Sequence, residues 1–217
     1  CAAEHQTAGR GRRGRQWVSP YGHNLYFSVL WRYAEDPSHL NGLSLAIGVA
    51  VMRSLKQLGL DSLGLKWPND IYYQQRKLGG ILLEVSGESS GPCHVVVGLG
   101  LNLLLSNKQA KTINQPWTDL QQISGVAATL DRNQLLASLI NEILIVLKDY
   151  AQAGLALYLD EWRSYDVVQF KPVRLEVGDL VMDAVVDGID DQGFLRVTDL
   201  QGQPRRFASG EISMKLS

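Results

Sequence analysis

The 217-residue chain is 45% hydrophobic and 20% charged, and its 21 basic and 22 acidic side chains leave a net charge of −1. This composition argues against a disordered chain and against bulk attraction to nucleic acid or anionic membrane, although it allows a local basic patch. The two cysteines, Cys1 and Cys93, are too few for a disulfide framework and fit a reducing cytoplasm, and no apolar run is long enough for a membrane-spanning helix.

The first half of the chain is predicted to alternate short strands with one buried helix. A Gly/Arg loop over residues 9–15 precedes an expected strand at 24–31, which is rich in aromatic and β-branched residues. Apolar residues spaced three to four apart predict a buried helix over 40–58. Further strands are expected at 63–67, 71–73, 78–85 and 94–105. The continuous apolar character of the last strand predicts that both of its faces are buried.

The second half is predicted to contain helices followed by short strands. Asp131 can cap a helix that ends at Gly154, and a short helix is expected at 155–162. Beyond residue 170 the hydrophobic period changes to two, and strands are expected at 173–177, 181–187, 194–198 and 211–216. These patterns predict an α/β domain followed by a small barrel.

Four arginines and three glycines alternate over residues 9–15. Glycines let the backbone approach a ligand, and guanidinium groups match phosphate oxygens, so the segment predicts an anion-binding loop. The alternative is a solvated basic loop. The G-x-G-x-x-G spacing of Gly9, Gly11 and Gly14 would indicate a dinucleotide fingerprint only before a helix, and turn-forming residues follow it instead.

Residues 66–70 read Lys-Trp-Pro-Asn-Asp at the end of an expected strand. A carboxylate beside an amide suits Mg²⁺, which prefers oxygen ligands and is commonly shared with substrate phosphates. The alternative is an Asx turn after Pro68, with Trp67 in the core.

Two further segments combine small residues with a polar one. Lys77 begins the run Lys-Leu-Gly-Gly-Ile-Leu, where its mobile positive charge would bind a carboxylate or a phosphate. The alternative is a surface lysine at a hairpin turn. The run Gly-Leu-Gly-Leu-Asn ends at Asn102, whose amide is suited either to reading a base edge or to satisfying backbone groups.

These four segments, in their order and spacing, resemble biotin protein ligases, particularly the bacterial kind that also represses the biotin operon. The resemblance covers essentially the whole chain. It implies a biotin/lipoate ligase-like α/β (α+β) core over residues 1–168, with a mixed central sheet and packed helices, and an SH3-like C-terminal barrel over residues 169–217. It also implies a reaction in which biotin, ATP and Mg²⁺ give biotinyl-5′-AMP, and biotin then passes to a lysine of biotin carboxyl carrier protein.

The resemblance also implies roles for individual residues. Lys77, Arg12 and Asp70 would be catalytic, with Asp70 organising Mg²⁺. The biotin-binding residues would be Gln6, Gly9, Arg10, Gly11, Arg12, Lys77, Leu82, Gly98 and Gly100. The nucleotide-binding residues would be Arg12, Arg15, Trp17, Lys66, Asn69, Lys77 and Asn102. In this scheme Lys77 holds the biotin carboxylate and the α-phosphate together, Trp17 stacks on the adenine, and the arginine loop folds over the adenylate.

The sequence departs from the family pattern at its start. The family's Ser-Thr-Asn segment, which hydrogen-bonds the biotin ring, and the repressors' winged helix-turn-helix domain would both precede Cys1, so we expect further residues upstream. DNA binding is expected only through such a domain, a homodimer is allowed, and no membrane partner is expected. The alternatives are a lipoate or octanoyl ligase of the same fold, and a biotin-adenylate-sensing repressor module in the full-length protein.

Overall fold

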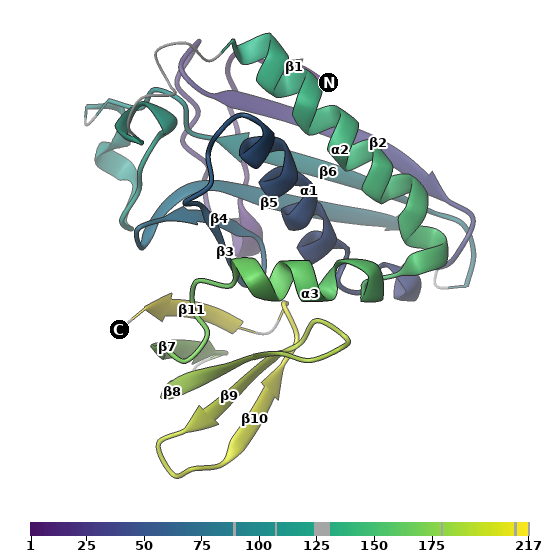
Figure 1. The fold of residues 1–217 in the computed structure, drawn as a ribbon, viewed down its shortest axis with the longest axis vertical. Coiled ribbons are helices and arrows are strands. Elements are labelled where there is room, and N and C mark those ends of the chain that lie inside the picture. The colour runs from purple at the N-terminus through teal and green to yellow at the C-terminus, as the bar shows by residue number, and fades with distance from the viewer. Residues whose placement is uncertain (89, 107, 124–130, 179, 211, 217) are drawn as a thin grey trace.

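The computed structural model describes residues 1–88, 90–106, 108–123, 131–178, 180–210 and 212–216. Within these ranges the chain forms a six-stranded sheet, with helices on one face, and a separate five-stranded sheet (Figure 1). The larger sheet has the strand order β1-β2-β6-β5-β4-β3, and its ladders are antiparallel. Its strands are β1 (Ala2–Ala3), β2 (Leu25–Tyr33), β3 (Gly64–Lys66), β4 (Asp70–Tyr73), β5 (Arg76–Gly87) and β6 (Cys93–Leu101).

Three α-helices in the described part of the chain cover one face of the larger sheet (Figure 1). α1 (Leu43–Gln57) packs against the other two helices, α2 (Arg132–Ala153) and α3 (Ala156–Tyr165), and each of the three also contacts the sheet. The side chain of Asp131 caps α2 by accepting a hydrogen bond from the backbone N–H of Asn133, and Gly154 ends the helix. No helix in the described residues has both the length and the apolar character needed to cross a membrane.

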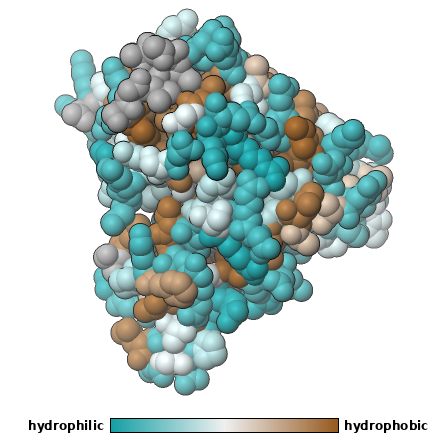
Figure 2. Space-filling model, in the orientation of Figure 1, coloured by the Kyte–Doolittle hydropathy of each residue, from teal (hydrophilic) through white to brown (hydrophobic). Residues whose placement is uncertain are grey.

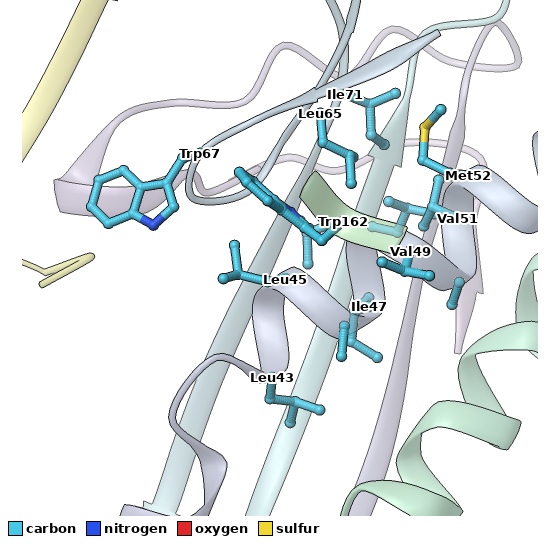
Figure 3. Packing of buried hydrophobic residues seen from close by; sticks show 14 of the residues in the cluster. Leu43, Leu45, Ile47, Val49, Val51, Met52, Leu65, Trp67, Ile71 and Trp162 are labelled. Carbon is cyan, nitrogen blue, oxygen red and sulfur yellow. The ribbon is translucent and has the colours of Figure 1, made fainter. Parts of the chain in front are cut away.

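The core of the larger unit lies where α1 faces the sheet. Figure 3 shows Ile47 and Val51 of α1 in one buried cluster with Leu65, Ile71 and Trp162. α1 packs closely because it carries a glycine at position 48, where a Cβ would lie 3.2 Å from Leu65 Cδ1. Burial of this apolar surface holds the helices on one face and leaves the opposite face of the sheet for other contacts.

The smaller sheet has the strand order β10-β9-β8-β7-β11 and lies beside α3 and the β3 end of the larger sheet (Figure 1). Its strands are β7 (Pro172–Val177), β8 (Leu180–Ile189), β9 (Leu195–Asp199), β10 (Pro204–Phe207) and β11 (Ile212–Leu216). The indole Nε1 of Trp67 donates to the carbonyl of Gly193 at 3.0 Å, which fastens the β8–β9 turn to the larger unit. Figure 2 shows hydrophilic residues over much of the helix-covered side, with hydrophobic residues in separate patches.

The α+β architecture with packed helices and a C-terminal β-unit is confirmed, and several details differ from the prediction. The helix expected from residue 40 begins at Leu43, because residues 37–40 form a 3₁₀ turn and Gly42 has φ +82°. Parallel pairing in the larger unit, expected for a mixed sheet, is limited in the described residues to the isolated bridges Leu65–Asp166 and Lys77–Trp117.

Two strand predictions also need correction. β6 ends at Leu101 rather than at residue 105, and burial alternates along it, so the prediction of two buried faces is wrong. β10 is not predicted by the sequence, because Pro-Arg-Arg-Phe has no apolar alternation. Glu211, the first residue of the last expected strand, lies outside the described residues. The domain boundary at 168/169 stays a prediction.

Candidate functional site

The face of the larger sheet away from the helices carries a row of small and polar residues. Along this row Tyr26 pairs with Gly100, Gly100 with Gly80, Gly80 with Asp70, and Asp70 with Lys66. Residues paired across antiparallel strands project from the same face. The two adjacent glycines leave a stretch of bare backbone on β5 and β6, which we call the glycine floor.

A second row runs parallel to the first and pairs Ser28 with Gly98 and Gly98 with Leu82. A Cβ at position 98 would make only ordinary contacts, at 3.5 Å from the carbonyl of Leu82. The structure therefore places Leu82, Gly98 and Gly100, three of the residues predicted to bind biotin, on one face of neighbouring strands.

The indole ring of Trp17 lies on the glycine floor. A Cβ at position 100 would be 2.6 Å from Trp17 Cε2, so the ring reaches this position only because residue 100 is a glycine. The ammonium of Lys77 lies 5.6 Å from the centre of the ring. In the part of the chain that the structure describes, Trp17 Nε1 is buried with no hydrogen-bond partner. An unpaired buried donor is costly, so a ligand that supplies an acceptor here would be stabilised.

A half-buried ion pair lies at one end of the floor. Lys77 Nζ is 2.5 Å from Asp70 Oδ1, and the two side chains are 15% and 14% exposed. The backbone of Lys77 is fixed on its free side by residues 116–118, since its N–H donates to the carbonyl of Pro116 and its carbonyl accepts from Thr118. This supporting segment is not predicted from the sequence. It has no strand-length pattern, and a lone Pro-Trp-Thr run gives little signal.

The Gly/Arg loop turns back on itself above this face. The N–H of Gly11 donates to the carbonyl of Arg15 at 2.6 Å, and the N–H of Trp17 donates to the carbonyl of Gly9 at 2.9 Å. Arg13 and Gly14 both have positive φ, at 57° and 72°. The turn that follows the loop is not a helix, in agreement with the rejection of a dinucleotide fingerprint.

Three arginines of the loop are anchored at three different places. Arg10 Nη2 is 2.8 Å from Glu84 Oε2, and Arg12 Nη1 donates to Asn69 Oδ1 at 3.3 Å. Burial lowers the pKa of Arg12, and the carboxylate of Asp70 opposes this shift. Arg15 Nη2 donates to an atom of the smaller sheet, Ser213 Oγ, at 2.6 Å.

A recess of about 450 Å³ opens between the arginine loop and β5. Its walls are residues 10–14 of the loop, residues 82–84 of β5, and Gly210 from the chain just before β11. The recess therefore lies between two segments that the family resemblance predicts to bind biotin. It also receives a wall from the C-terminal unit, which the sequence does not predict.

Gln6 and Gly9, which are both predicted to bind biotin, lie close together. The backbone N–H of Gln6 donates to Ser19 Oγ at 2.9 Å, and a Cβ at position 9 would lie 3.3 Å from Gln6 Oε1. The same Cβ would be 2.5 Å from the carbonyl oxygen of Trp17, so position 9 requires glycine.

Two residues predicted to bind the nucleotide have protein partners. Lys66 is 7% exposed, its ammonium donates to the carbonyl of Met214 at 2.8 Å, and burial lowers its pKa. Asn102 is 4% exposed, and its amide nitrogen donates to the carbonyl of Thr118 at 3.1 Å. Asn102 therefore satisfies a backbone group, which is the alternative left open by the sequence, and its contact with adenine stays a prediction.

The Lys-Trp-Pro-Asn-Asp segment has features of both interpretations, the polar site and the turn with a core tryptophan. Trp67 is in the core, as the Asx-turn alternative expects, while Asn69 and Asp70 face Arg12 and Lys77. In the described residues no group of three His, Cys, Asp or Glu side chains is placed to hold a metal ion. One carboxylate with an adjacent amide fits Mg²⁺ only if most of the ligands come from phosphates and water.

Comparisons with known proteins show the family of the chain. The biotin/lipoate A/B protein ligase family matches residues 1–102, and the biotin protein ligase C-terminal domain matches residues 170–215. The biotin--[acetyl-CoA-carboxylase] ligase of Mycobacterium tuberculosis is 35% identical over 97% of this chain and 76% of its own length. The chain belongs to the biotin protein ligase family.

The chain is also similar to two further members of the biotin protein ligase family. The bifunctional ligase/repressor BirA of Escherichia coli is 43% identical over 99% of this chain, which spans 66% of the length of that relative. The biotin protein ligase of Aquifex aeolicus, in complex with biotin and ATP, superimposes with a TM-score of 0.81 and 28% identity. That match covers 100% of this chain and 88% of the Aquifex chain.

Proposed function

We propose that this chain activates biotin with ATP and transfers it to a lysine of a biotin carboxyl carrier protein. In the first step a carboxylate oxygen of biotin bonds to the α-phosphorus of ATP, the bond to the bridging oxygen breaks, and biotinyl-5′-AMP and pyrophosphate form. In the second step the ε-amine of the carrier lysine bonds to the biotinyl carbonyl carbon and loses a proton, while the bond to AMP breaks.

The Lys77–Asp70 pair beside the arginine loop is the observation that carries the proposal. Both steps gather negative charge around one phosphorus, so catalysis depends mainly on positioned positive charge. Lys77 and Arg12 supply that charge, and the Trp17 ring, which lies on the glycine floor, offers an apolar surface beside Lys77. The likeness to the Aquifex ligase with biotin and ATP supports the same assignment.

The proposal includes an Mg²⁺ ion that would bind together with ATP. Asp70 and Asn69 would hold the ion together with phosphate oxygens of ATP. The bound ion would neutralise charge on those phosphates. The roles given above to Gln6, Leu82, Gly98 and Trp17, and a homodimer, are likewise parts of the proposal.

Exchange of labelled pyrophosphate into ATP tests the first step. We expect exchange that requires both biotin and Mg²⁺, and lipoate or octanoate in place of biotin should give little. Exchange with lipoate but not with biotin would show that the chain is instead a lipoate ligase of the same fold. No exchange with any of these acids would contradict the proposed function.

The BirA relatives favour a second role for the full-length protein. Their names combine ligase and repressor, and this chain would supply the part that senses biotinyl-5′-AMP. A mobility-shift assay with the full reading frame and its own biotin-operon DNA tests this role. We expect the adenylate to strengthen binding, and binding that ignores the adenylate would contradict the sensing role.

A further inference from the structure

The last strand of the smaller sheet reaches two positively charged side chains of the larger unit. Arg15 Nη2 donates to Ser213 Oγ at 2.6 Å, across 198 positions of sequence. Lys66 Nζ donates to the backbone carbonyl of the next residue, Met214, at 2.8 Å. Both cations therefore end on consecutive residues of β11, although one belongs to a loop and the other to β3.

β11 is a rigid support for these contacts. It pairs with β7 along its whole length, with Ser213 opposite Glu176 and Met214 opposite Leu175. Ser213 is 9% exposed, and Met214 belongs to the hydrophobic core. The hydroxyl of Ser213 is therefore held in place by the ladder and by the core beneath it.

The loop that carries Arg15 has side-chain contacts of different strength at its two ends. At its start, Arg10 pairs with Glu84, but these side chains are 69% and 44% exposed, and a pair this open contributes little. At its end, the charge-assisted bond from Arg15 reaches a buried strand. The recess beside the loop also takes one wall from Gly210, just before β11.

We propose that Ser213 is a positioning residue that holds Arg15, and with it the end of the arginine loop, in the orientation that binds the triphosphate of ATP. Ser213 acts through Arg15 and does not touch the nucleotide. A guanidinium carries five N–H donors, so the contact with one hydroxyl leaves others for phosphate oxygens. This inference rests on the proposed function, in which Arg15 contacts ATP.

Trypsin cleavage of the unliganded protein tests the contact without any need for activity. Trypsin cuts after arginine, so looser anchoring should speed cleavage within residues 9–15. In Ser213→Ala we expect cleavage to accelerate roughly 3- to 10-fold, which corresponds to the loss of one hydrogen bond. Ser213→Thr keeps a hydroxyl and should cleave at the wild-type rate. Cleavage of Ser213→Ala at the wild-type rate would overturn the proposal.

A matched control separates positioning from general stability. Thr198→Val removes a hydroxyl of the same sheet that donates to Asp187 at 3.0 Å, away from the loop. We expect wild-type loop cleavage in this variant and a similar small change of Tm in both variants. Faster cleavage in Thr198→Val as well would show that loosening of the whole sheet causes the effect, and would overturn the proposal.

Kinetics decide whether the contact serves the nucleotide. In Ser213→Ala the KM for ATP should rise roughly 3- to 10-fold, while the KM for biotin changes less than about twofold. Equal rises in both KM values would contradict a specific role for Ser213 in ATP binding. If the wild-type protein shows no biotin-dependent exchange, the proposed function fails, and the cleavage experiment still decides whether Ser213 holds the loop.

Discussion

The two sheets use their charged residues in different ways. In the smaller sheet, charged side chains pair with neighbours on adjacent strands, as Arg174 does with Asp183 and Lys215 with Glu176. These pairs are exposed, so each contributes little to stability. In the larger sheet, Lys77 and Asp70 are mostly withdrawn from water, and Arg12 reaches Asn69 from a distant loop.

The difference follows from what covers each face. Helices cover one face of the larger sheet, and glycines at 80 and 100 let Trp17 and Lys77 lie directly on its other face. The smaller sheet fills its inner face with apolar residues such as Val173 and Val197. Partly dehydrated charges interact strongly with a charged ligand, whereas exposed charges are screened. We therefore assign the chemistry to the larger sheet, and support of the loop to the smaller one.

The largest expected difference in reaction rate is between replacement of Lys77, in the larger sheet, and replacement of Lys215, in the smaller one. Lys77→Gln should slow adenylate formation by roughly 30- to 1,000-fold, because a charge-assisted contact that strengthens in the transition state is worth about 2–4 kcal/mol. Biotin affinity should fall much less. Lys215→Gln breaks a pair of the same 2.5 Å length in the smaller sheet and should leave the rate unchanged. Single-turnover kinetics and biotin titration check this, and equal losses of rate and affinity would make Lys77 a simple binding residue.

Alanine at two glycines should separate binding from stability. At Gly100 the new methyl would collide with the Trp17 ring, so Gly100→Ala should displace the ring and weaken biotin binding by roughly 10-fold or more. At Gly193, which has φ +79° and whose Cβ would lie 2.8 Å from Leu45 Cδ1, alanine should cost about 1–3 kcal/mol of stability.

Calorimetric titration with biotin and urea unfolding measure these two effects. Gly91→Ala, in the turn between β5 and β6, is the control, since its Cβ would lie 3.8 Å from Glu88 Oε2, and it should change neither property much. A large loss of stability in Gly100→Ala with normal biotin binding would contradict the assignment of the glycine floor to the ligand.

Much of the fold can be predicted from periodicity, and the errors have physical causes. α2 is predicted with both caps, because Asp131 and Gly154 have strong local preferences. β6 is misjudged because glycines at 98 and 100 look apolar in sequence, while in the sheet they lie on a face that is only partly buried. An apolar run cannot show which of its residues face a vacant surface.

The motifs of the site are predicted from the sequence, but many of the contacts between them are not. The motifs place Lys77, Asp70 and the arginine loop in one functional group, and the structure brings them together. The contacts of Arg15 with Ser213 and of Lys66 with Met214 are not predicted, because they join residues far apart in sequence. Such partners depend on how the two units dock, which no local pattern encodes.

Asp166, in the segment that joins α3 to β7, should make the free energy of unfolding depend on pH. Burial raises the pKa of Asp166 to about 6, from 3.8, and its carboxylate accepts a hydrogen bond from the N–H of Val168. The folded state holds this proton more tightly than the unfolded chain, so stability falls as the pH rises from about 4 to about 6 and the loss is constant above that. Asp166→Asn keeps an acceptor and should remove this loss, roughly 1–2 kcal/mol after allowance for partial exposure.

Urea unfolding of the wild type and the variant across this pH range measures the term. The two stabilities should converge near pH 4 and separate by pH 7, with the variant more stable. Asp160→Asn, at a side chain that is 97% exposed, is the control and should follow the wild type. A constant difference between Asp166→Asn and the wild type at every pH would contradict the assignment.

The smallest expected effect concerns retention of the intermediate by the arginine loop. Arg12→Gly removes the contact with Asn69 and adds backbone freedom, so the loop should open more often. The adenylate should still form at Lys77 and Asp70, but more slowly, because one of the two positive charges is lost. Released biotinyl-5′-AMP would acylate bystander lysines, which streptavidin detects on an unrelated protein. We expect this labelling, relative to the amount of adenylate formed, to rise roughly 3- to 10-fold. Arg13→Gly is the control, because Arg13 has φ +57°, which glycine adopts readily. Unchanged relative labelling in Arg12→Gly, with the adenylate still formed, would show that Arg12 does not retain the intermediate.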